Sequence, residues 1–441
     1  MIIPDFIEYK VTRWDTNPYF MGSYSAIPIN VDAYVRERIK NYVIRDKIYF
    51  IGEYCSTEYQ ATTTGAHDSG IYCANKLDKK KIPKNKEIAI IGAGISGLAC
   101  AKQLKHNGFE HITIYEASNR IGGRICTDME WGIELGASWI HGTNNNSITD
   151  LVNNVGNILI HTNYDDIEVR DVMSGTINNE AKNKFMEYCF EINKLAENEE
   201  YSDKSESMRK WARNNKYLDN DTISEWIEQV KISQDIGIDA SISSCIGQQE
   251  GKSYDGGDSF IKGGYHKIPD YLARELDIKL DRPVSKIEII GNKIEINFKN
   301  SEKQYSDIII MAVPHAILKN NLIEIIDMPA KLKKDINSLE TGNLEKVFLK
   351  YPVKWWDKCM YGIVGKLNNN VYDNAHDNLY DNNAYDDKEK RWSEFHDVSE
   401  LTGFPCLFAF SGGSCVKTRP DSDLEVAMEA HAKLTGAFRN L

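Results

Sequence analysis

Apolar residues between positions 87 and 117 follow the pattern of a strand, a helix and a second strand. The first apolar run, EIAIIGA, begins at Glu87, and glycines at 92, 94 and 97 separate it from residues with helical spacing that continue through Gln103. The second apolar run, HITIYEA, begins at His111. Two short apolar runs joined through a helix predict a βαβ unit with parallel strands.

Three other parts of the chain have patterns of their own. Residues 150–250 are mostly polar with helical spacing, which predicts helices over a cleft. Residues 286–298 alternate between apolar and polar on both sides of Gly291-Asn292, which predicts a β-hairpin. Residues 367–386 hold 11 Asn or Asp in 20 positions and predict an exposed low-complexity loop. Residues 78–86 (DKKKIPKNK) are basic and polar and predict a solvated linker.

Composition places the chain among soluble globular proteins of two or three domains. Its 441 residues are 41% hydrophobic and 27% charged, which excludes extended disorder. The net charge of −12 argues against nucleic-acid binding through a basic face. We find no signal-peptide pattern and no run of roughly 18–20 apolar residues, so no membrane contact is expected. The nine cysteines show neither CxxC nor metal-like spacing, so we expect reduced thiols, no metal site and a cytoplasmic location.

The Gly92-x-Gly94-x-x-Gly97 turn stands between the first predicted strand and the helix, the context in which this motif binds a dinucleotide. The first glycine permits the tight turn, the second lets the backbone approach a pyrophosphate, and the third lets helix and strand pack closely. The helix N-terminus offers free N–H groups to phosphates. Glu116 ends the next strand, where its carboxylate can accept hydrogen bonds from ribose hydroxyls. The motif alone does not separate NAD from FAD.

A second glycine pair follows Glu116 closely. Gly122 and Gly123 let another loop approach the cofactor, and Arg124 can neutralise its phosphates. The series from Glu116 through Arg120 to Arg124 (EASNRIGGR) resembles the N-terminal signature of the flavin-dependent amine oxidases, a family that includes monoamine oxidase, polyamine and spermine oxidases, and lysine-specific histone demethylases. Residues 134–142 (ELGASWIHG) are most similar to the polyamine and spermine oxidase branch.

The remaining motifs of that family normally stand at its C-terminus, and here they come first. Residues 12–25 (TRWDTNPYFMGSYS) resemble the family's TRW…DP…GSYS segment, and residues 48–70 resemble its closing element. Residues 423–441 resemble the helix that precedes TRW in the family. Joining Leu441 to Met1 would restore the family's order, so we expect a circular permutation with residues 78–86 as the splice. A mis-assembled gene model is the alternative.

The resemblance implies an α/β fold with a Rossmann-like FAD-binding domain and an α+β substrate-binding domain, circularly permuted. The expected divisions are 1–77 for the permuted C-terminal flavin-binding segment, 78–86 for the linker, 87–145 for the βαβ and GGR segment, 146–254 for the helical part of the substrate domain, 255–320 for the continuation of the FAD-binding domain, and 321–441 for the continuation of the substrate domain.

The resemblance also assigns roles to single residues. Thr63 and Thr64 would open a helix aimed at the flavin N1–C2=O edge. Tyr24 would form one wall of an aromatic cage, and His141 would face the substrate amine. Ser23 stands where monoamine oxidase carries the flavin-linking cysteine, so FAD is expected to bind noncovalently. The other residues that the resemblance places at the cofactor are Trp14, Gly52, Glu53, Gly136, Ala137, Ser138, Trp139 and Val284.

Lys346 is the third catalytic candidate. Leu344, Lys346 and Phe348 share one face of an alternating strand, and a lysine between two apolar neighbours either extends to solvent or has a function. The surrounding residues 341–349 (TGNLEKVFL) resemble the family strand whose lysine reaches a water at flavin N5. The resemblance therefore favours a function.

The implied reaction is oxidation of the C–N bond of a primary or secondary amine, with a polyamine as first choice, to an imine and then an aldehyde, while dioxygen becomes hydrogen peroxide. A histone lysine demethylase-like activity is one alternative. A non-catalytic FAD-binding protein is another, because Thr64 replaces the family's usual histidine and residues 410–414 (FSGGS) replace a usual glycine–acid step. A nicotinamide dehydrogenase is disfavoured by Arg124. The sequence leaves the oligomeric state open.

Overall fold

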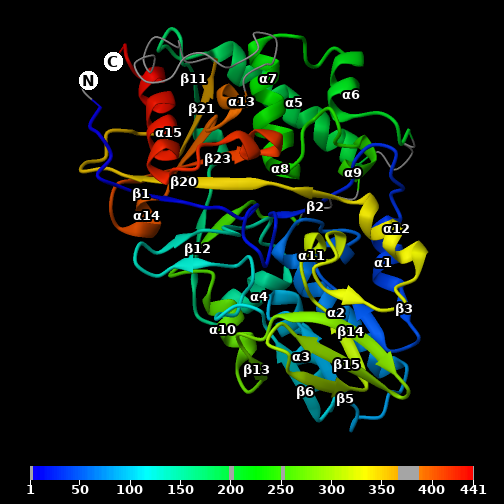
Figure 1. Cartoon of the computed structure of the whole chain (residues 1–441). Coiled ribbons are helices and arrows are strands. Elements are labelled where there is room, and N and C mark those ends of the chain that lie inside the picture. The colour runs from blue at the N-terminus through cyan, green and yellow to red at the C-terminus, as the bar shows by residue number, and fades with distance from the viewer. Residues whose placement is uncertain (1–2, 198–202, 250–253, 366–386, 441) are drawn as a thin grey trace.

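The computed structural model describes residues 3–197, 203–249, 254–365 and 387–440 and has two lobes (Figure 1). The low-complexity segment 367–386 lies outside these described residues. The lower lobe in Figure 1 carries the predicted βαβ unit, and the upper lobe carries a second large sheet with helices that include α5 (Asn179–Glu197), α7 (Thr222–Glu228) and α15 (Asp423–Ala437). None of the helices in the described part of the chain is both long and apolar enough to span a membrane.

A six-stranded sheet forms the centre of the lower lobe. Its neighbouring strands run parallel to one another except for the last pair, which is antiparallel. The predicted βαβ unit is confirmed, and the helix within it runs three residues further than the pattern indicated. The strands, in spatial order, are β13 (Asp277–Lys279), β6 (His111–Tyr115), β5 (Glu87–Ile91), β17 (Ile308–Met311), β4 (Ile48–Phe50) and β3 (Val43–Ile44).

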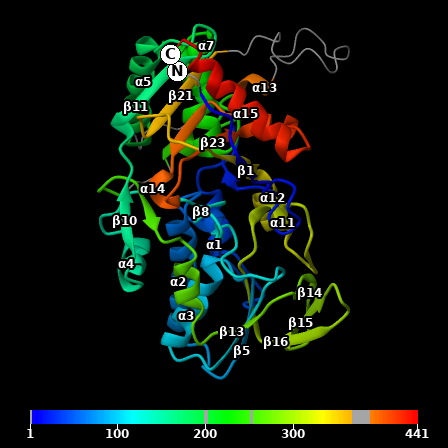
Figure 2. The ribbon, with the colours of Figure 1, turned by 90° about the vertical axis from the view of Figure 1, so that its left-hand side faces the viewer.

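Helices α2 (Thr63–Lys79) and α3 (Ile95–His106) pack together on one face of this sheet. Figure 2 shows them on the opposite side from the hairpin of β14 (Val284–Ile290) and β15 (Lys293–Phe298), which confirms the predicted hairpin. The two helices approach very closely at Gly70, where a Cβ atom would lie 2.2 Å from the backbone oxygen of Ser96. A glycine at this point therefore sets the distance between the helices.

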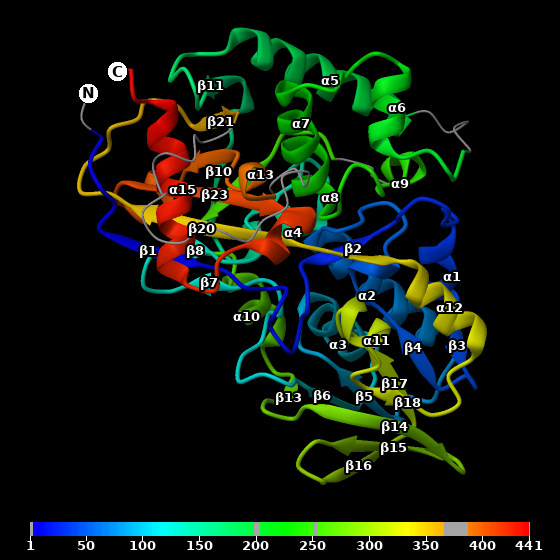
Figure 3. The ribbon, with the colours of Figure 1, turned by 45° about the horizontal axis from the view of Figure 1, so that its top comes forward.

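The upper lobe is built on a second six-stranded sheet. Its core combines apolar residues of the strands with one face of α15 (Asp423–Ala437), which Figure 3 shows in front of the sheet. Helices including α5 (Asn179–Glu197) pack against the other end of the sheet. The strands, in spatial order, are β1 (Glu8–Val11), β20 (Leu344–Lys350), β23 (Cys406–Gly412), β22 (Glu394–Asp397), β21 (Met360–Val364) and β11 (Ile167–Asp171).

Residues 150–250 are less uniformly helical than their spacing predicted. They include α5 to α9, but β10 (Ile158–His161) pairs with β12 (Ser259–Lys262), and β11 runs parallel to β21. Each of these strands is only four or five residues long. Their partners lie about 100 to 200 residues away in the chain, so a local pattern gave little sign of them.

The first 77 residues contribute to both lobes. Strand β1 pairs with β20 in the upper sheet, and β4 lies between β17 and β3 in the lower one. Near the C-terminus, α15 packs against the beginning of the chain through a contact between His431 Nε2 and the Asp5 carboxylate (3.6 Å) and an edge-to-face contact between His431 and Phe6. Between α2 and β5, the Lys84 carbonyl accepts a hydrogen bond from the Glu110 amide (3.0 Å), and α2 itself extends into the expected linker as far as Lys79.

The contact at Gly70 can be tested by the substitution Gly70→Ala. The added methyl group meets the backbone of α3, so we expect a loss of roughly 2 kcal/mol in the free energy of unfolding, in spite of the better helix propensity of alanine. Urea unfolding followed by circular dichroism measures this. Lys79→Ala, at an exposed position of the same helix, is the matched control and is expected to change little. Equal stability of the two variants would contradict the proposed role of Gly70.

Candidate functional site

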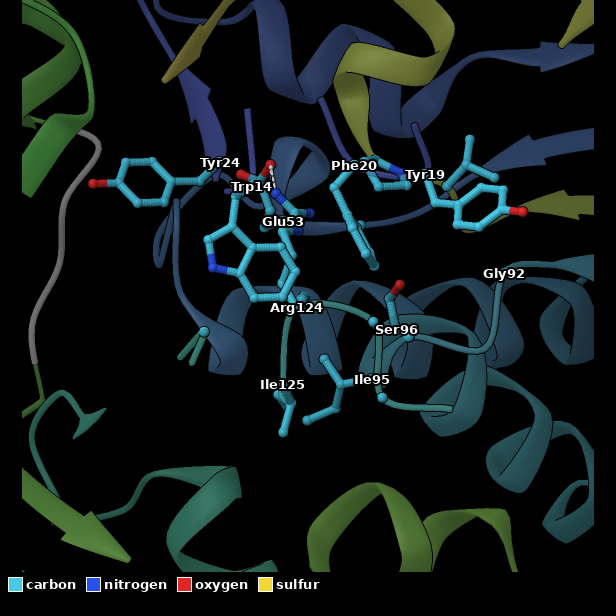
Figure 4. Close-up of a pocket in the computed structure, with 18 of the residues that line it drawn as sticks. Trp14, Tyr19, Phe20, Tyr24, Glu53, Gly92, Ile95, Ser96, Arg124 and Ile125 are labelled. Atoms are coloured by element: carbon cyan, nitrogen blue, oxygen red, sulfur yellow. Dashed lines mark ion pairs between the residues drawn. The ribbon is translucent and has the colours of Figure 1, made fainter. Parts of the chain in front are cut away.

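One elongated cavity connects the two lobes. It begins at the carboxyl ends of β5 and β6, passes the N-termini of α3 and α2, and ends against β20 and β23 of the upper sheet. Figure 4 shows part of its wall, with Trp14, Glu53 and Arg124 close together and Gly92 and Ser96 further along. Side chains that are far apart in the sequence therefore face one common space.

The two glycine turns predicted from the sequence touch each other in this cavity. Gly94 and Gly122 form a parallel β-bridge, and the Gly122 amide donates to the Ala93 carbonyl (2.9 Å). A Cβ atom on Gly123 would lie 3.2 Å from the Gly94 Cα atom. Gly92 has a φ of +111°, and a Cβ atom at this position would lie 2.7 Å from the Ala312 carbonyl oxygen. A larger residue would therefore be strained there. The contact between the turns thus depends on their glycines.

The space beside Gly94 suits a pyrophosphate. No heavy atom other than those of its chain neighbours lies within 4 Å of a Cβ position at Gly94, and α3 begins at the next residue. The helix N-terminus therefore presents backbone N–H groups beside open space, which is the arrangement that binds phosphate groups. Ser96, in the first turn of α3, also lines the cavity.

Glu116 is held in a fixed position next to this turn. One carboxylate oxygen accepts from the Ala93 amide (2.7 Å), and the other accepts from the amide and the hydroxyl of Ser118 (2.9 and 2.8 Å). The carboxylate still borders the cavity, together with Val284 at the start of β14. The glycine turns, the helix end and an acidic side chain thus line one side of the cavity, as a dinucleotide requires.

Glu53 and Arg124 form a second charged centre further along the cavity. The Glu53 carboxylate accepts from the amide and hydroxyl of Ser25 (3.0 and 2.8 Å) and lies 3.6 Å from the Arg124 guanidinium, the ion pair drawn in Figure 4. Arg36 lies 4.0 Å from Glu53 and donates to the Ser25 hydroxyl (2.7 Å). Arg36 is fully buried, although it belongs to a charged run, VRERIK, that is typical of an exposed helix, so its role is not apparent from the sequence.

The N-terminus of α2 also points at the cavity. The helix begins at Thr63 as predicted, and the Thr62 hydroxyl caps it by accepting from the Gly65 amide (3.0 Å). Thr63 lines the cavity, and its hydroxyl lies 2.5 Å from the Tyr265 hydroxyl. Thr64 turns away, because its hydroxyl donates to Asn146 (3.0 Å).

Lys346 reaches the cavity from the middle of β20. Its ammonium donates to the carbonyls of Glu134 (2.9 Å) and Gly136 (2.5 Å) and to the Ser138 hydroxyl (2.5 Å). Burial lowers the pKa of Lys346 to about 7, although the carboxylates of Glu134 and Glu345 raise it in part. The side chain is 4% exposed, so it does not extend to solvent.

Glu134 is the other buried ionisable group beside Lys346. Burial raises the pKa of its carboxyl to about 7, while hydrogen bonds from Tyr265 and Thr127 and the charge of Lys346 act in the opposite direction. An amine and a carboxyl that both titrate near neutral pH lie next to the cavity. Shifted pKa values of this kind are typical of functional sites.

Tyr24 and His141 face the cavity at its upper end. The Tyr24 hydroxyl donates to the Gln234 carbonyl (2.5 Å), and Figure 4 shows its ring projecting away from Trp14 and Glu53. His141 lies on a loop, is 54% exposed, and its Nδ1 lies 3.0 Å from Asp258. Partial desolvation of the ring against the cavity wall lowers the pKa of His141, but the hydrogen bond and charge of Asp258 outweigh this effect, so the pKa is raised above its ordinary value.

Two tryptophans complete the middle of the cavity. Trp14 donates from its indole nitrogen to the Leu135 carbonyl (3.0 Å) and packs edge-to-face on Phe20. Trp139 packs on Phe260 and lies beside Phe410, which also lines the cavity. These aromatic side chains give the cavity flat apolar walls between its charged ends.

Most of the residues singled out in the sequence lie around this one cavity. Three do not line it: Gly97 packs against the Gly92 carbonyl, Thr64 binds Asn146, and Arg120 donates to backbone carbonyls of its own loop. Those that line it are Trp14, Tyr24, Gly52, Glu53, Thr63, Gly92, Gly94, Glu116, Gly122, Gly123, Arg124, Gly136, Ala137, Ser138, Trp139, His141, Val284 and Lys346.

Comparison with known proteins places the chain among flavoproteins. The family model described as flavin containing amine oxidoreductase matches residues 2–77 and 95–390. The chain is 27% identical to human lysine-specific histone demethylase 2 over 339 residues, which are 69% of this chain and 39% of that protein. It is 27% identical to probable polyamine oxidase 4 of Arabidopsis thaliana over 306 residues, 64% of this chain and 61% of that protein. The chain thus spans less than two thirds of these relatives.

A solved structure of wild-type putrescine oxidase bound to putrescine shares the mixed α/β fold. The TM-score is 0.61 at 17% identity, and the match covers 80% of this chain and 83% of that one. The family match implies FAD as the cofactor. The open space at Gly94, the two helix N-termini and the carboxylate of Glu116 fit the parts of such a dinucleotide.

The shifted pKa of Lys346 predicts a pH dependence of stability. Between pH 7 and about 10 the unfolded chain keeps a proton on this amine that the folded chain has lost, so folding is favoured as the pH rises. In Lys346→Met this contribution is absent, and the difference in unfolding free energy between wild type and variant is expected to rise by up to about 1.4 kcal/mol per pH unit. Urea unfolding at pH 7, 8 and 9 measures it.

Lys350→Met is the control, because Lys350 lies on the same strand but pairs with Glu8 at the surface (2.6 Å). No comparable slope is expected for this variant. Parallel pH profiles for wild type and Lys346→Met would mean that the three acceptors keep Lys346 protonated in the folded protein.

Proposed function

The chain belongs to the flavin containing amine oxidoreductases, and from this premise we propose that it oxidises the C–N bond of a primary or secondary amine with FAD held in the cavity. The observation that carries the proposal is the position of Lys346. This buried amine lies in the same cavity as the two glycine turns, Tyr24 and His141. The cavity thus combines a dinucleotide-binding end with a polar, aromatic end that accepts a small amine.

The residues of the chain have separable tasks in this proposal. The glycine turns and the N-terminus of α3 bind the pyrophosphate, Glu116 binds the ribose, and Glu53 with Arg124 binds the part of FAD nearer the upper lobe. FAD held by these residues would supply the redox chemistry, namely acceptance of a hydride from the carbon next to the nitrogen and reduction of dioxygen by two electrons and two protons to hydrogen peroxide. The N-terminus of α2 at Thr63 places positive partial charge at the flavin.

At the reacting end, Lys346 and His141 control protons. Lys346 holds a proton among three acceptors and has a pKa of about 7, so it can position a water molecule and exchange a proton with it near neutral pH. His141, oriented by Asp258, and the ring of Tyr24 place the amine. Water then hydrolyses the imine product to an aldehyde and an amine.

We propose noncovalent binding of FAD. The side chain that stands at the position of the family's flavin-linking cysteine is Ser23, and its hydroxyl is engaged on β20, where it donates to the Leu344 carbonyl (2.9 Å) and accepts from the Leu344 amide (2.9 Å). Because the Ser23 hydroxyl both donates to and accepts from the backbone of β20, its role in this proposal is structural.

We propose a reducing, cytoplasmic location, which the spacing of the cysteines supports.

Polyamines are the first choice of substrate. The identity to plant polyamine oxidases and the acidic side chains near His141 both support a cationic substrate. A histone lysine demethylase-like activity is the second candidate, and the similarity to lysine-specific histone demethylase 2 favours it. Both candidates place an amine nitrogen at the same end of the cavity.

Anaerobic addition of spermine to the purified protein tests the proposal. We expect an oxidised flavin spectrum that spermine bleaches, followed by release of hydrogen peroxide when air is readmitted. Lys346→Met is expected to slow the bleaching at least about tenfold without loss of the flavin, because it removes a proton-exchanging group. Lys350→Met should behave as wild type. A flavin that stays oxidised with spermine, other amines and methylated lysine peptides would favour the non-catalytic alternative.

We also propose that the chain is a circular permutation of the usual family order. The motifs of residues 12–25 and 48–70 support it, and so does the way β1 and β4 complete sheets whose other central strands come later in the chain. The contact of α15 with Asp5 and Phe6 supports a short connection between the two ends of the described chain.

Re-ordering the chain tests the permutation. A variant in which residue 441 is joined to residue 1 by a short Gly/Ser linker and the chain is opened within residues 78–86 should fold, bind FAD and react with amines as the original does. A re-ordered protein without flavin, beside an original that binds it, would contradict the proposal. Absence of flavin in the original order alone would favour a mis-assembled gene model.

A further inference from the structure

The loop that carries His141 is joined to the first turn of α2 by the buried side-chain amide of Asn146. Asn146 is 1% exposed and caps α4 (Ser147–Asn154), where its Oδ1 accepts from the Ile148 amide (2.9 Å). Figure 2 shows α4 beside α2, and apolar residues of both helices belong to one core. The amide thus lies where the substrate end of the cavity meets a helix whose N-terminus points at that cavity.

Every hydrogen-bonding position of the Asn146 amide is used. Its Oδ1 also accepts from the Thr64 hydroxyl (3.0 Å), and its Nδ2 donates to the Gly142 carbonyl (2.9 Å) and, at a longer distance, to the His141 carbonyl (3.4 Å). A side-chain amide has two donor hydrogens and one oxygen with two lone pairs, so these three bonds and the one to Ile148 fill it. Because the amide cannot turn without losing several of them, it acts as a rigid link.

Asp258 holds the same loop from the other side. One of its carboxylate oxygens accepts from the Gly142 amide (3.1 Å), and the other lies 3.0 Å from Nδ1 of His141. The carbonyl of His141 and the N–H of Gly142 belong to one peptide group and point in opposite directions. The peptide is therefore held between Asn146 and Asp258, and the position of the exposed imidazole depends on both.

Thr64 connects this link to the end of α2 that faces the cavity. It is 4% exposed and follows Thr63, which lines the cavity, in the first turn of the helix. The route from the helix end to the His141 loop is two hydrogen bonds long, first from Thr64 to Asn146 and then from Asn146 to the loop carbonyls. A threonine at the position where the family usually has a histidine thus has a defined partner in this chain.

A second polar contact joins the same two helices at the neighbouring residue. The Ser147 hydroxyl donates to Asp68 of α2 (2.8 Å) and lies 3.3 Å from Nδ1 of His67. Among the described residues, the hydrogen bonds through Asn146 continue to the loop of His141, whereas those of Ser147 end at α2. Ser147 therefore offers a matched control for Asn146.

We propose that Asn146 and Thr64 are positioning residues: their link keeps His141 at a fixed place relative to the helix end that faces the flavin. The inference rests on the amine oxidation proposed above and extends it to two residues outside the cavity wall. Transfer between two bound partners depends on their separation, and different elements hold the cofactor and the amine. A rigid connection between these elements preserves the separation without any contact between Asn146 and either partner.

Amide hydrogen exchange of the purified flavoprotein tests the link in the absence of any amine. In Asn146→Ser the hydroxyl can still cap α4 but is too short to reach the loop, so we expect residues 141–145 to exchange about tenfold faster while α4 keeps its protection. Thr64→Val should speed exchange of the same segment by a smaller factor, and Thr64→Ser, which keeps the donor, should retain most of the protection. Ser147→Ala should leave exchange of residues 141–145 unchanged.

Anaerobic flavin reduction by spermine tests the consequence at the site. We expect Asn146→Ser to lower the quotient of limiting rate and amine dissociation constant by about fivefold or more, with the spectrum of the oxidised flavin unchanged. His141→Gln, combined with Asn146→Ser, shows whether Asn146 acts through His141. Once the imidazole is absent, Asn146→Ser should cost less than about twofold more, because residues that act as a unit give non-additive effects. Ser147→Ala should match wild type.

Two results would overturn the inference. One is unchanged exchange of residues 141–145 in Asn146→Ser, and the other is an effect of this variant on flavin reduction that is equally large with and without His141. Should Asn146→Ser fail to fold, Thr64→Val and Thr64→Ser provide the same comparison. In either case reduction of the wild-type flavin by spermine would leave the proposed function standing. Failure of every amine to reduce the wild-type flavin would contradict the proposed function, and the positioning of an amine with it.

Discussion

The parallel pairing of β17 with both β4 and β5 is the constraint on which the site depends. Ile309 lies opposite Ile48 on one side and Ala89 on the other, so the strands before the two helix N-termini end at the same edge of one sheet. Helix α3 follows β5, and α2 follows β4. Both helices therefore direct their N-termini into the same space, and the cavity lies where this edge faces the upper sheet.

The two ends of the cavity differ in how they handle charge. At the dinucleotide end, backbone N–H groups and Arg124 compensate negative charge, and Glu53 and Glu116 are fixed by hydrogen bonds. At the amine end, Lys346 and Glu134 are both close to neutrality because burial opposes their charged forms. Under the proposed function, an interior that disfavours charge would also promote the loss of a proton from an amine substrate before oxidation.

Local motifs in the sequence indicated much of the cavity, because their chemistry depends on residues close together in the chain. The glycine turns, the hairpin at Gly291 and the start of α2 at Thr63 are of this kind. The alternating pattern of residues 344–348 placed Lys346 on the same strand face as two apolar residues. It left open whether the lysine is buried, which only the fold decides. Arg36 and Asp258 gave no local sign, because each acquires its role from a partner that the fold provides.

The position of β4 has a consequence for biosynthesis. Its partner β17 is about 260 residues further along the chain, so the ribosome makes Ile48, Tyr49 and Phe50 long before the strand that covers their edge exists. All three side chains are buried in the finished protein. Such late pairing slows folding and leaves an apolar strand edge unprotected until the later part of the chain has been made.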